Sequence, residues 1–156
     1  MLRRALIIIA ITVLGGQALA CSSGGDGAPS ATGGGIAYTQ TASVGGVEVE
    51  ATWPGGGGET PEGLADYPPD RFLTIEVGMD THSGDLGSVD MVQASSLQIG
   101  SRSLQPEAWV ASNNDAHHRS GVLVFQRGQI TGPVALRVAL KDEVADLVWD
   151  KVPDGG

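Results

Sequence analysis

The sequence predicts an all-β protein, an antiparallel β-sandwich of immunoglobulin-like or related type with seven to eight short strands. Three observations predict it. Apolar and polar residues alternate over several stretches, as in strands that bury one face. Glycine, proline, asparagine and aspartate separate these stretches, as expected of turns. No stretch has the apolar period of an amphipathic helix; residues 143–148 come nearest and are short.

The strand candidates lie within residues 36–152, which form one predicted domain. Alternation is strictest in residues 47–53, 73–80 and 134–141. Residues 122–125, Val-Leu-Val-Phe, are apolar at each position, which is typical of a strand covered on both faces. The remaining candidates are shorter: residues 37–42, 97–99, 108–111 and 147–149.

The tryptophans and the longest loop complete the predicted domain. Trp53 and Trp149 share the phase of the apolar strand positions, so we expect them in the core, whereas Trp109 is expected to be partly exposed. The stretch from Pro54 to Asp70 has no apolar period and is predicted to be a mobile surface loop. Residues 153–156 are predicted to be a tail.

Residues 1–20 have the features of a secretory signal. Two arginines open the segment, residues 5–14 are almost all apolar, and the run Ala18-Leu19-Ala20 ends in small residues. The apolar run is shorter than the roughly 20 residues that a membrane-spanning helix needs. The sequence therefore predicts cleavage before Cys21.

Cys21 is the single cysteine of the chain. The run Ala18-Leu19-Ala20-Cys21 resembles the lipobox of bacterial lipoproteins. The resemblance implies a diacylglycerol on the thiol, a mature chain tethered to a membrane, and an extracytoplasmic location, periplasmic or at the cell surface. The alternative is an ordinary cleavage site that leaves a free thiol, which is awkward in an oxidising compartment. Residues 21–35 would be the lipidated cysteine and a flexible Gly/Ser-rich tether.

Charge and cysteine content exclude several classes of function. The chain has 9 basic and 18 acidic residues; without the two arginines of the signal, 7 basic residues remain and the net charge is −11. Nucleic acid is not expected as a partner, because phosphates require basic patches. A lone cysteine provides no disulfide, no CxxC redox pair and no thiolate zinc cluster.

Two polar clusters contain all three histidines of the chain. The first follows the strand candidate 73–79, and the second precedes the candidate 122–125. Because neighbouring antiparallel strands would bring these two ends together, both clusters are expected at the same end of the sandwich. The candidate site residues are Asp80, Thr81, His82, Asp85, His117 and His118.

This set supports two interpretations. The histidines and a neighbouring carboxylate could bind copper or zinc. Alternatively, a structural clasp without any cofactor could satisfy the backbone groups of the loops. The clasp is favoured, because no HxxxH or HExxH pair is present and because adjacent strand residues point to opposite faces. The metal ligands would be His82, His117 and His118 with Asp80 or Asp85. The clasp residues would be Asp80, Thr81, His82 and His117.

An enzyme is not expected, and a hydrolase is the least favoured alternative. Ser83 is adjacent to His82 in the sequence, too near to serve as its nucleophile, and Ser120 lacks a GxSxG elbow. No set of nucleophile, base and orienting group can be assembled from the sequence.

The motifs of the domain resemble those of a family of uncharacterised bacterial and archaeal extracytoplasmic domains. That family carries Asp-Thr-His-Ser-x-Asp-Leu, here residues 80–86, and His-His-x-x-Gly-Val-Leu-x-Phe, here residues 117–125. A late strand ends near a tryptophan, so the resemblance covers Phe72 to Trp149. Ala116 stands where members often have glycine, which puts the turn before the histidines in doubt. The resemblance implies a non-catalytic domain and no defined activity.

The sequence thus predicts a lipid-anchored, non-enzymatic module of the cell envelope. Its histidine-bearing end would bind an envelope protein or a small ligand. The alternative function is binding or delivery of copper or zinc through the three histidines.

Lipid anchoring can be tested by replacing Cys21 with alanine. We expect the wild-type protein in the membrane fraction and the Cys21→Ala protein in the soluble fraction, with altered electrophoretic mobility, because acyl chains contribute about 0.8 kcal/mol of membrane affinity per buried CH₂. Ser22→Ala is the matched control and should stay in the membrane fraction. A Cys21→Ala protein that fractionates and migrates like the wild type would show that Cys21 is not the anchor.

Overall fold

The computed structural model describes residues 39–53 and 62–152, which all lie in one compact unit. The predicted signal, Cys21 with its tether, and the tail 153–156 lie outside the described residues, as do residues 37–38 of the first strand candidate. Within the described ranges, no helix is long and apolar enough to cross a membrane.

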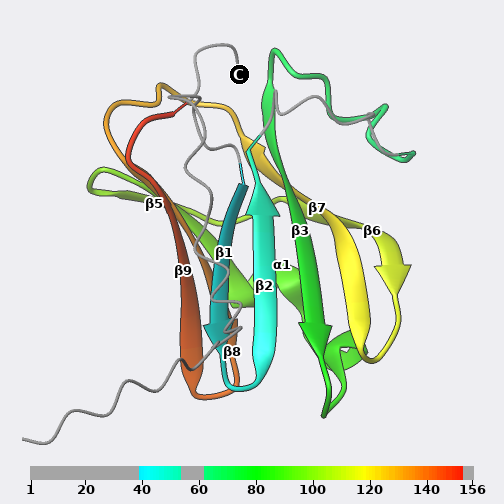
Figure 1. Cartoon of the computed structure of the whole chain (residues 1–156). Coiled ribbons are helices and arrows are strands. Elements are labelled where there is room, and N and C mark those ends of the chain that lie inside the picture. Colours follow the sequence, from blue (N-terminus) through cyan, green and yellow to red (C-terminus); the bar gives the residue numbers. More distant parts are fainter. Residues whose placement is uncertain (1–38, 54–61, 153–156) are drawn as a thin grey trace, which may run out of the picture. The chain divides into compact units, whose positions relative to one another are not determined.

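Nine strands in the described residues form two antiparallel sheets (Figure 1). The first sheet has the order β1-β2-β3-β7-β6, and the second has the order β5-β4-β8-β9. The predicted all-β antiparallel sandwich is confirmed, although the predicted number of strands was too small. The strands are β1 (Thr39–Val44), β2 (Val47–Thr52), β3 (Phe72–Thr81), β4 (Ser95–Ile99), β5 (Arg102–Leu104), β6 (Ala108–Asn114), β7 (His118–Gln126), β8 (Val134–Leu140) and β9 (Glu143–Trp149).

The sequence missed one strand and predicted several others too short, β9 among them. β5 has only three residues and forms a hairpin with β4, so it is too short to show a period. β9 begins at Glu143 and includes the stretch that came nearest to a helix. Its outward positions Val144 and Val148 are apolar and 40% and 43% exposed. Apolar residues on both faces obscure the alternation, which explains the shortened prediction.

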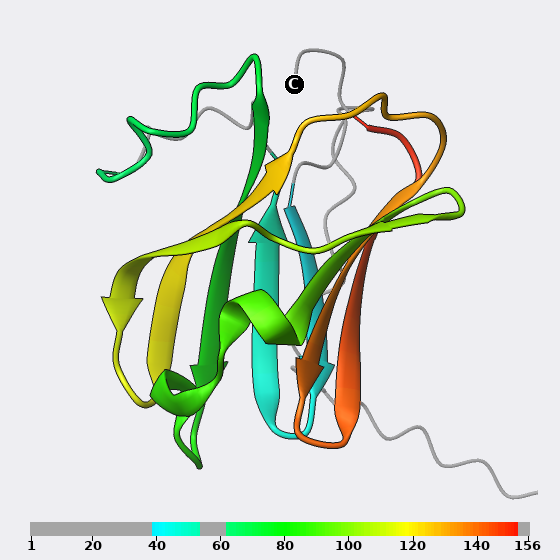
Figure 2. The same cartoon turned by 180° about the vertical axis from the view of Figure 1, so that it is seen from behind.

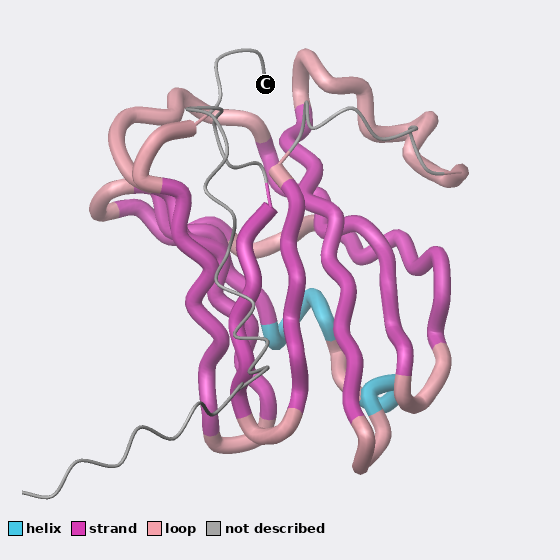
Figure 3. The backbone as a smooth tube through the Cα atoms, viewed as in Figure 1, coloured by secondary structure: helices cyan, strands magenta, loops and turns pink. Residues whose placement is uncertain are grey.

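Two short helices lie in the connection from β3 to β4 (Figure 3). They are a 3₁₀ turn, η1 (Leu86–Ser88), and a single α-turn, α1 (Met91–Ala94), which Figure 2 shows from the other side. Asp85 caps η1 by accepting from Gly87 N, and Asp90 caps α1 by accepting from Val92 N and Gln93 N. Helices of this length have no measurable apolar period, so the sequence did not predict them.

One hydrophobic core joins the inner faces of the two sheets. Trp53 and Trp149 are fully buried in it as predicted, with ring centroids 5.4 Å apart and planes tilted by 56°. β1 lies against β9, so the edges of the two sheets meet along one side (Figure 1).

The described part of the loop before β3 packs on the sheet and is not the mobile excursion that the sequence predicted. Residues 54–61 lie outside the described residues, but Leu64 is only 7% exposed and packs on Val122 and Val124 of β7. Those two valines face outward from the sheet, so the loop covers the outer face of β7. The apolar stretch 122–125 is therefore covered on both faces as predicted, by the core on one side and by this loop on the other.

Gly121 on the inner face of β7 makes room for Trp109 of β6. A Cβ atom at Gly121 would lie 2.5 Å from the carbonyl oxygen of Val110 and 2.7 Å from Cζ2 of Trp109. Trp109 is half-buried, as the sequence predicted, and its ring packs against the core. The absence of a side chain at Gly121 thus lets the indole lie over β7 on the inner face of the sheet.

Alanine at Gly121 should therefore destabilise the fold. We expect Gly121→Ala to lower the free energy of unfolding by about 1–3 kcal/mol, the usual cost of overpacking, as measured by urea denaturation. Gly78→Ala on the adjacent strand is the matched control, because a Cβ there meets no atom within 4 Å. That change should leave stability unaltered or raise it by up to about 1 kcal/mol. Equal losses in the two variants would contradict the packing argument.

Candidate functional site

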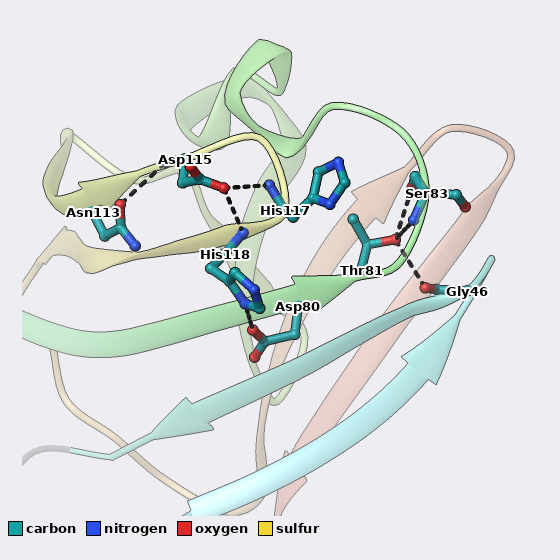
Figure 4. Close-up of polar contacts among 8 residues, drawn as sticks. All are labelled: Gly46, Asp80, Thr81, Ser83, Asn113, Asp115, His117 and His118. Atoms are coloured by element: carbon teal, nitrogen blue, oxygen red, sulfur yellow. Dashed lines mark hydrogen bonds and ion pairs between the residues drawn. The ribbon is translucent and has the colours of Figure 1, made fainter.

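The two histidine clusters meet at one end of the first sheet, as predicted. β3 pairs with β7, and Asp80 lies directly opposite His118 (Figure 4). β7 begins at His118, before the predicted start at residue 122, so His118 belongs to the ladder and not to a loop. The side chains of Asp80 and His118 point to the outer face of the sheet, away from the core.

His118 and Asp80 form an exposed pair. Nδ1 of the imidazole is hydrogen-bonded to Oδ1 of the carboxylate, and the two side chains are 68% and 63% exposed. Water and salt screen a charge pair at this exposure, so it contributes at most about 1 kcal/mol to stability. The pair fixes one tautomer of the neutral ring: Nδ1 carries the proton and Nε2 is left as an acceptor.

His117 acts through its backbone. Its carbonyl oxygen accepts from Thr81 N at 3.0 Å, which extends the β3–β7 ladder by one step. The side chains of His117 and His82 are both exposed, and the rings of His117 and His118 point in different directions (Figure 4).

Asp115 organises the turn that carries the histidine pair. Its Oδ1 accepts from the backbone N–H of His117 at 2.8 Å and of His118 at 3.4 Å. These two hydrogen bonds lower the pKa of Asp115 below its ordinary value, because they favour the charged carboxylate. A depressed pKa stabilises the folded turn above the unfolded value of 3.8, and this contribution is lost as the pH falls through the folded pKa.

The predicted metal ligands do not come together as one group in the part of the chain that the structure describes. There, no three His, Cys, Asp or Glu side chains are placed to hold one metal ion. Of the five predicted ligands, His118 and Asp80 are in contact, whereas Asp85 is the cap of η1. Binding of copper or zinc stays a prediction, which metal analysis of the purified protein would test.

Thr81 joins two turns at this end of the sandwich. Its Oγ1 lies 3.0 Å from the carbonyl oxygen of Gly46 and 2.8 Å from that of Ser83, and its hydroxyl can donate to either. The same oxygen accepts from Ser83 N at 3.2 Å (Figure 4). Thr81 therefore links the β1–β2 turn to the loop that follows β3, although the aspartate and imidazoles of the predicted clasp take no part in this link.

Arg119 is the most important residue that the sequence analysis missed. It is only 7% exposed and donates through Nη1 to the carbonyl oxygens of Leu86, at 2.7 Å, and Val89. Its guanidinium carbon lies 5.6 Å from the centroid of the Trp109 ring. Arg119 is two residues before Gly121, so its side chain points to the inner face of β7. A charged residue at an inward strand position was the feature of the sequence that could have revealed it.

Burial changes the pKa of Arg119. Desolvation lowers its pKa, and the charges of Asp85 and Asp90 oppose that shift. An arginine stays protonated even so, because its ordinary pKa is far above neutral. A buried cation therefore holds the η1 loop against the sheet through two carbonyl groups.

A pocket of about 150 Å³ opens at this same end, between the two sheets. Three turns surround it: the β1–β2 turn, the loop after β3 and the β8–β9 turn. We call it the turn-end pocket. Its floor is apolar, and its mouth is charged. The floor residues are Val44, Val47, Leu86, Val89 and Leu140, and the mouth residues are Gly45, Ser83, Gly84, Asp85, Lys141, Asp142 and Glu143.

The mouth of the turn-end pocket contains unusual backbone positions. Lys141 has φ = 56°, the single positive φ among the non-glycine residues that the structure describes. A side chain in this region costs about 1–2 kcal/mol relative to glycine. Gly45 and Gly84 also have positive φ, 56° and 98°, which a glycine adopts without this cost.

Comparison with known proteins gives no match. No family model matches the chain, and no curated protein or solved structure matches it significantly. The resemblances to bacterial lipoproteins and to the extracytoplasmic family therefore stay predictions that rest on the motifs alone.

The role of Arg119 predicts a large difference between two arginine variants. Arg119→Met keeps most of the apolar stem but leaves the carbonyl groups of Leu86 and Val89 without their donor. We expect the free energy of unfolding to fall by about 2 kcal/mol, and the amides of the η1 loop to exchange faster with solvent. Arg137→Met is the control, because its bridge to Asp146 is exposed and should contribute less than about 1 kcal/mol. Unchanged exchange in the η1 loop of Arg119→Met would contradict the conclusion that Arg119 holds this loop against the sheet.

Proposed function

We propose that this protein is a lipid-anchored, non-enzymatic module of the bacterial cell envelope that binds a small ligand in the turn-end pocket. Lipidation at Cys21 and the Gly/Ser-rich tether are the parts of the proposal that come from the sequence. The observation that carries the binding function is the turn-end pocket, an apolar recess with a charged mouth at one end of the sandwich.

The chemistry of the pocket supports binding. Concave apolar sites with a few polar groups at the mouth are the usual form of small-molecule sites. An apolar cavity of similar size, about 150 Å³, accommodates benzene in another protein. The turn-end pocket therefore has room for one six-membered ring or a branched aliphatic group of similar size.

The pocket walls are held in place before any ligand arrives. Val47, Leu86 and Leu140 of the floor belong to the hydrophobic core. Thr81 links the β1–β2 turn to the loop after β3, and Arg119 holds the η1 part of that same loop. Preorganised walls lower the entropic cost of binding, because few groups lose freedom when the ligand enters.

The position of the pocket suits a tethered protein. The tether precedes Thr39, where β1 begins, and the pocket lies beyond Val44, where β1 ends. One strand of six residues, about 17 Å, separates these points. A domain held by its N-terminal side would thus carry the pocket at the end away from the attachment point.

The proposal includes no reaction. In the described part of the chain, no histidine lines the turn-end pocket, and Ser83 is its single hydroxyl side chain. The mouth carboxylates and the ammonium of Lys141 can orient a ligand by charge, which fits a binding role.

Binding can be tested with a neutral probe and pocket-filling variants. In an ¹⁵N-labelled full chain titrated with benzyl alcohol, we expect saturable amide shifts confined to residues 44–47, 83–89 and 140–143. Val89→Phe and Val44→Phe should weaken these shifts at least about fivefold, because each fills the recess. Val148→Phe, on the exposed outer face of β9, is the control for added aromatic surface. Shifts spread over the whole domain, or equal affinity in all variants, would contradict the proposal.

A further inference from the structure

We infer that the turn-end pocket selects a small organic cation, a compact apolar group that carries an ammonium. This inference rests on the proposed function and adds the charge class of the ligand. The carboxylates and the ammonium at the pocket mouth differ in number and in their position around it.

Acids outnumber cations at the mouth. Asp85, Asp142 and Glu143 supply three carboxylates, whereas Lys141 supplies one ammonium. The ion pairs among the described residues are His118–Asp80 and Arg137–Asp146, so Lys141 neutralises none of these carboxylates directly. Asp142 and Glu143, which have no ion-pair partner among the described residues, lie beside an apolar recess and fit a ligand that brings its own positive charge.

The buried Arg119 does not reverse this balance. Its Nη1 donates to the carbonyl oxygens of Leu86 and Val89. Asp85 and Asp90 both interact favourably with its charge. When Arg119 and Asp90 are counted with the mouth residues, four carboxylates face two cations, and the surroundings of the pocket stay negative.

Two glycines show where the charges lie around the mouth. A Cβ at Gly45 would lie 3.5 Å from Oε1 of Glu143, so this carboxylate lies over the β1–β2 turn. A Cβ at Gly84 would lie 3.8 Å from Nζ of Lys141, so the ammonium lies over the opposite loop. Glu143 and Lys141 therefore lie on different sides of the mouth, and Asp85, which follows Gly84, is on the side of Lys141. A ligand whose apolar group enters the floor would place its ammonium on the Glu143 side.

The field of the whole domain acts in the same direction. The outer face of the first sheet presents four more carboxylates, and the chain has a net charge of −9. Such a field raises the local concentration of cations and repels anions. The carboxylates on that face are Glu48, Glu50, Glu76 and Asp80.

Three probes that share one ring and differ in charge test this inference. With the purified full chain at low salt, we expect benzylamine to bind about fivefold more tightly than benzyl alcohol, and phenylacetate to bind about fivefold more weakly, because each exposed charge contact contributes at most about 1 kcal/mol. The differences should shrink when salt is raised, because salt screens exposed charges.

Charge variants locate the selectivity at the mouth. Glu143→Gln should lower the affinity for benzylamine about threefold and leave that for benzyl alcohol unchanged. Lys141→Gly should raise the affinity for benzylamine, because it removes the opposing cation without straining the turn. Glu107→Gln, an exposed acid next to β6 that does not line the pocket, is the control and should leave all three affinities within about twofold.

The outcomes separate the two proposals. If phenylacetate binds as tightly as benzylamine, or if Glu143→Gln leaves both affinities unchanged, the charge inference is wrong and the pocket still binds apolar groups. If none of the three probes shifts the pocket amides, the proposed function itself is wrong.

Discussion

The arrangement of this end of the sandwich depends on the burial of Arg119. A guanidinium on the inner face of a strand must find acceptors, because an unpaired buried charge would cost several kcal/mol. The backbone carbonyls of Leu86 and Val89 supply them, and the Trp109 ring covers the cation from β6. Gly121 has no side chain and so leaves room for that ring. The buried charge of Arg119 thus contacts both the η1 loop and the indole, and the indole in turn requires the glycine at position 121.

The turn-end pocket follows from the same constraint. Because Arg119 holds the η1 loop against the first sheet, Leu86 and Val89 become a wall of the pocket and not part of a free loop. Thr81 then fixes the β1–β2 turn to the start of this loop. The β8–β9 turn belongs to the second sheet, so the recess lies between this turn and the two linked turns of the first sheet. Structural interactions therefore create the candidate binding site.

The sequence predicted the elements that show a repeating apolar pattern. It did not predict the features that depend on individual contacts between residues distant in the chain. Alternation identified the long strands and the buried Trp53 and Trp149, because each core position repeats every second residue. The pairing of two such strands, β3 and β7, places Asp80 opposite His118. The role of Arg119 could not be predicted, since this residue resembles an ordinary strand cation until its acceptors, 30 or more residues away, are known. The pocket likewise combines three turns that are distant in the chain.

Lys141 connects the energetics of the pocket with its charge. A two-residue turn that needs positive φ is normally occupied by glycine or asparagine, because other side chains are strained there. The chain has a lysine at this position, with its ammonium beside Gly84. This placement gives the mouth its single cation, over the loop that follows β3, whereas Glu143 lies over the β1–β2 turn. Strained residues concentrate at functional sites, where the geometry they hold is used. The strain at Lys141 therefore supports the proposal that the mouth of the pocket is a binding site.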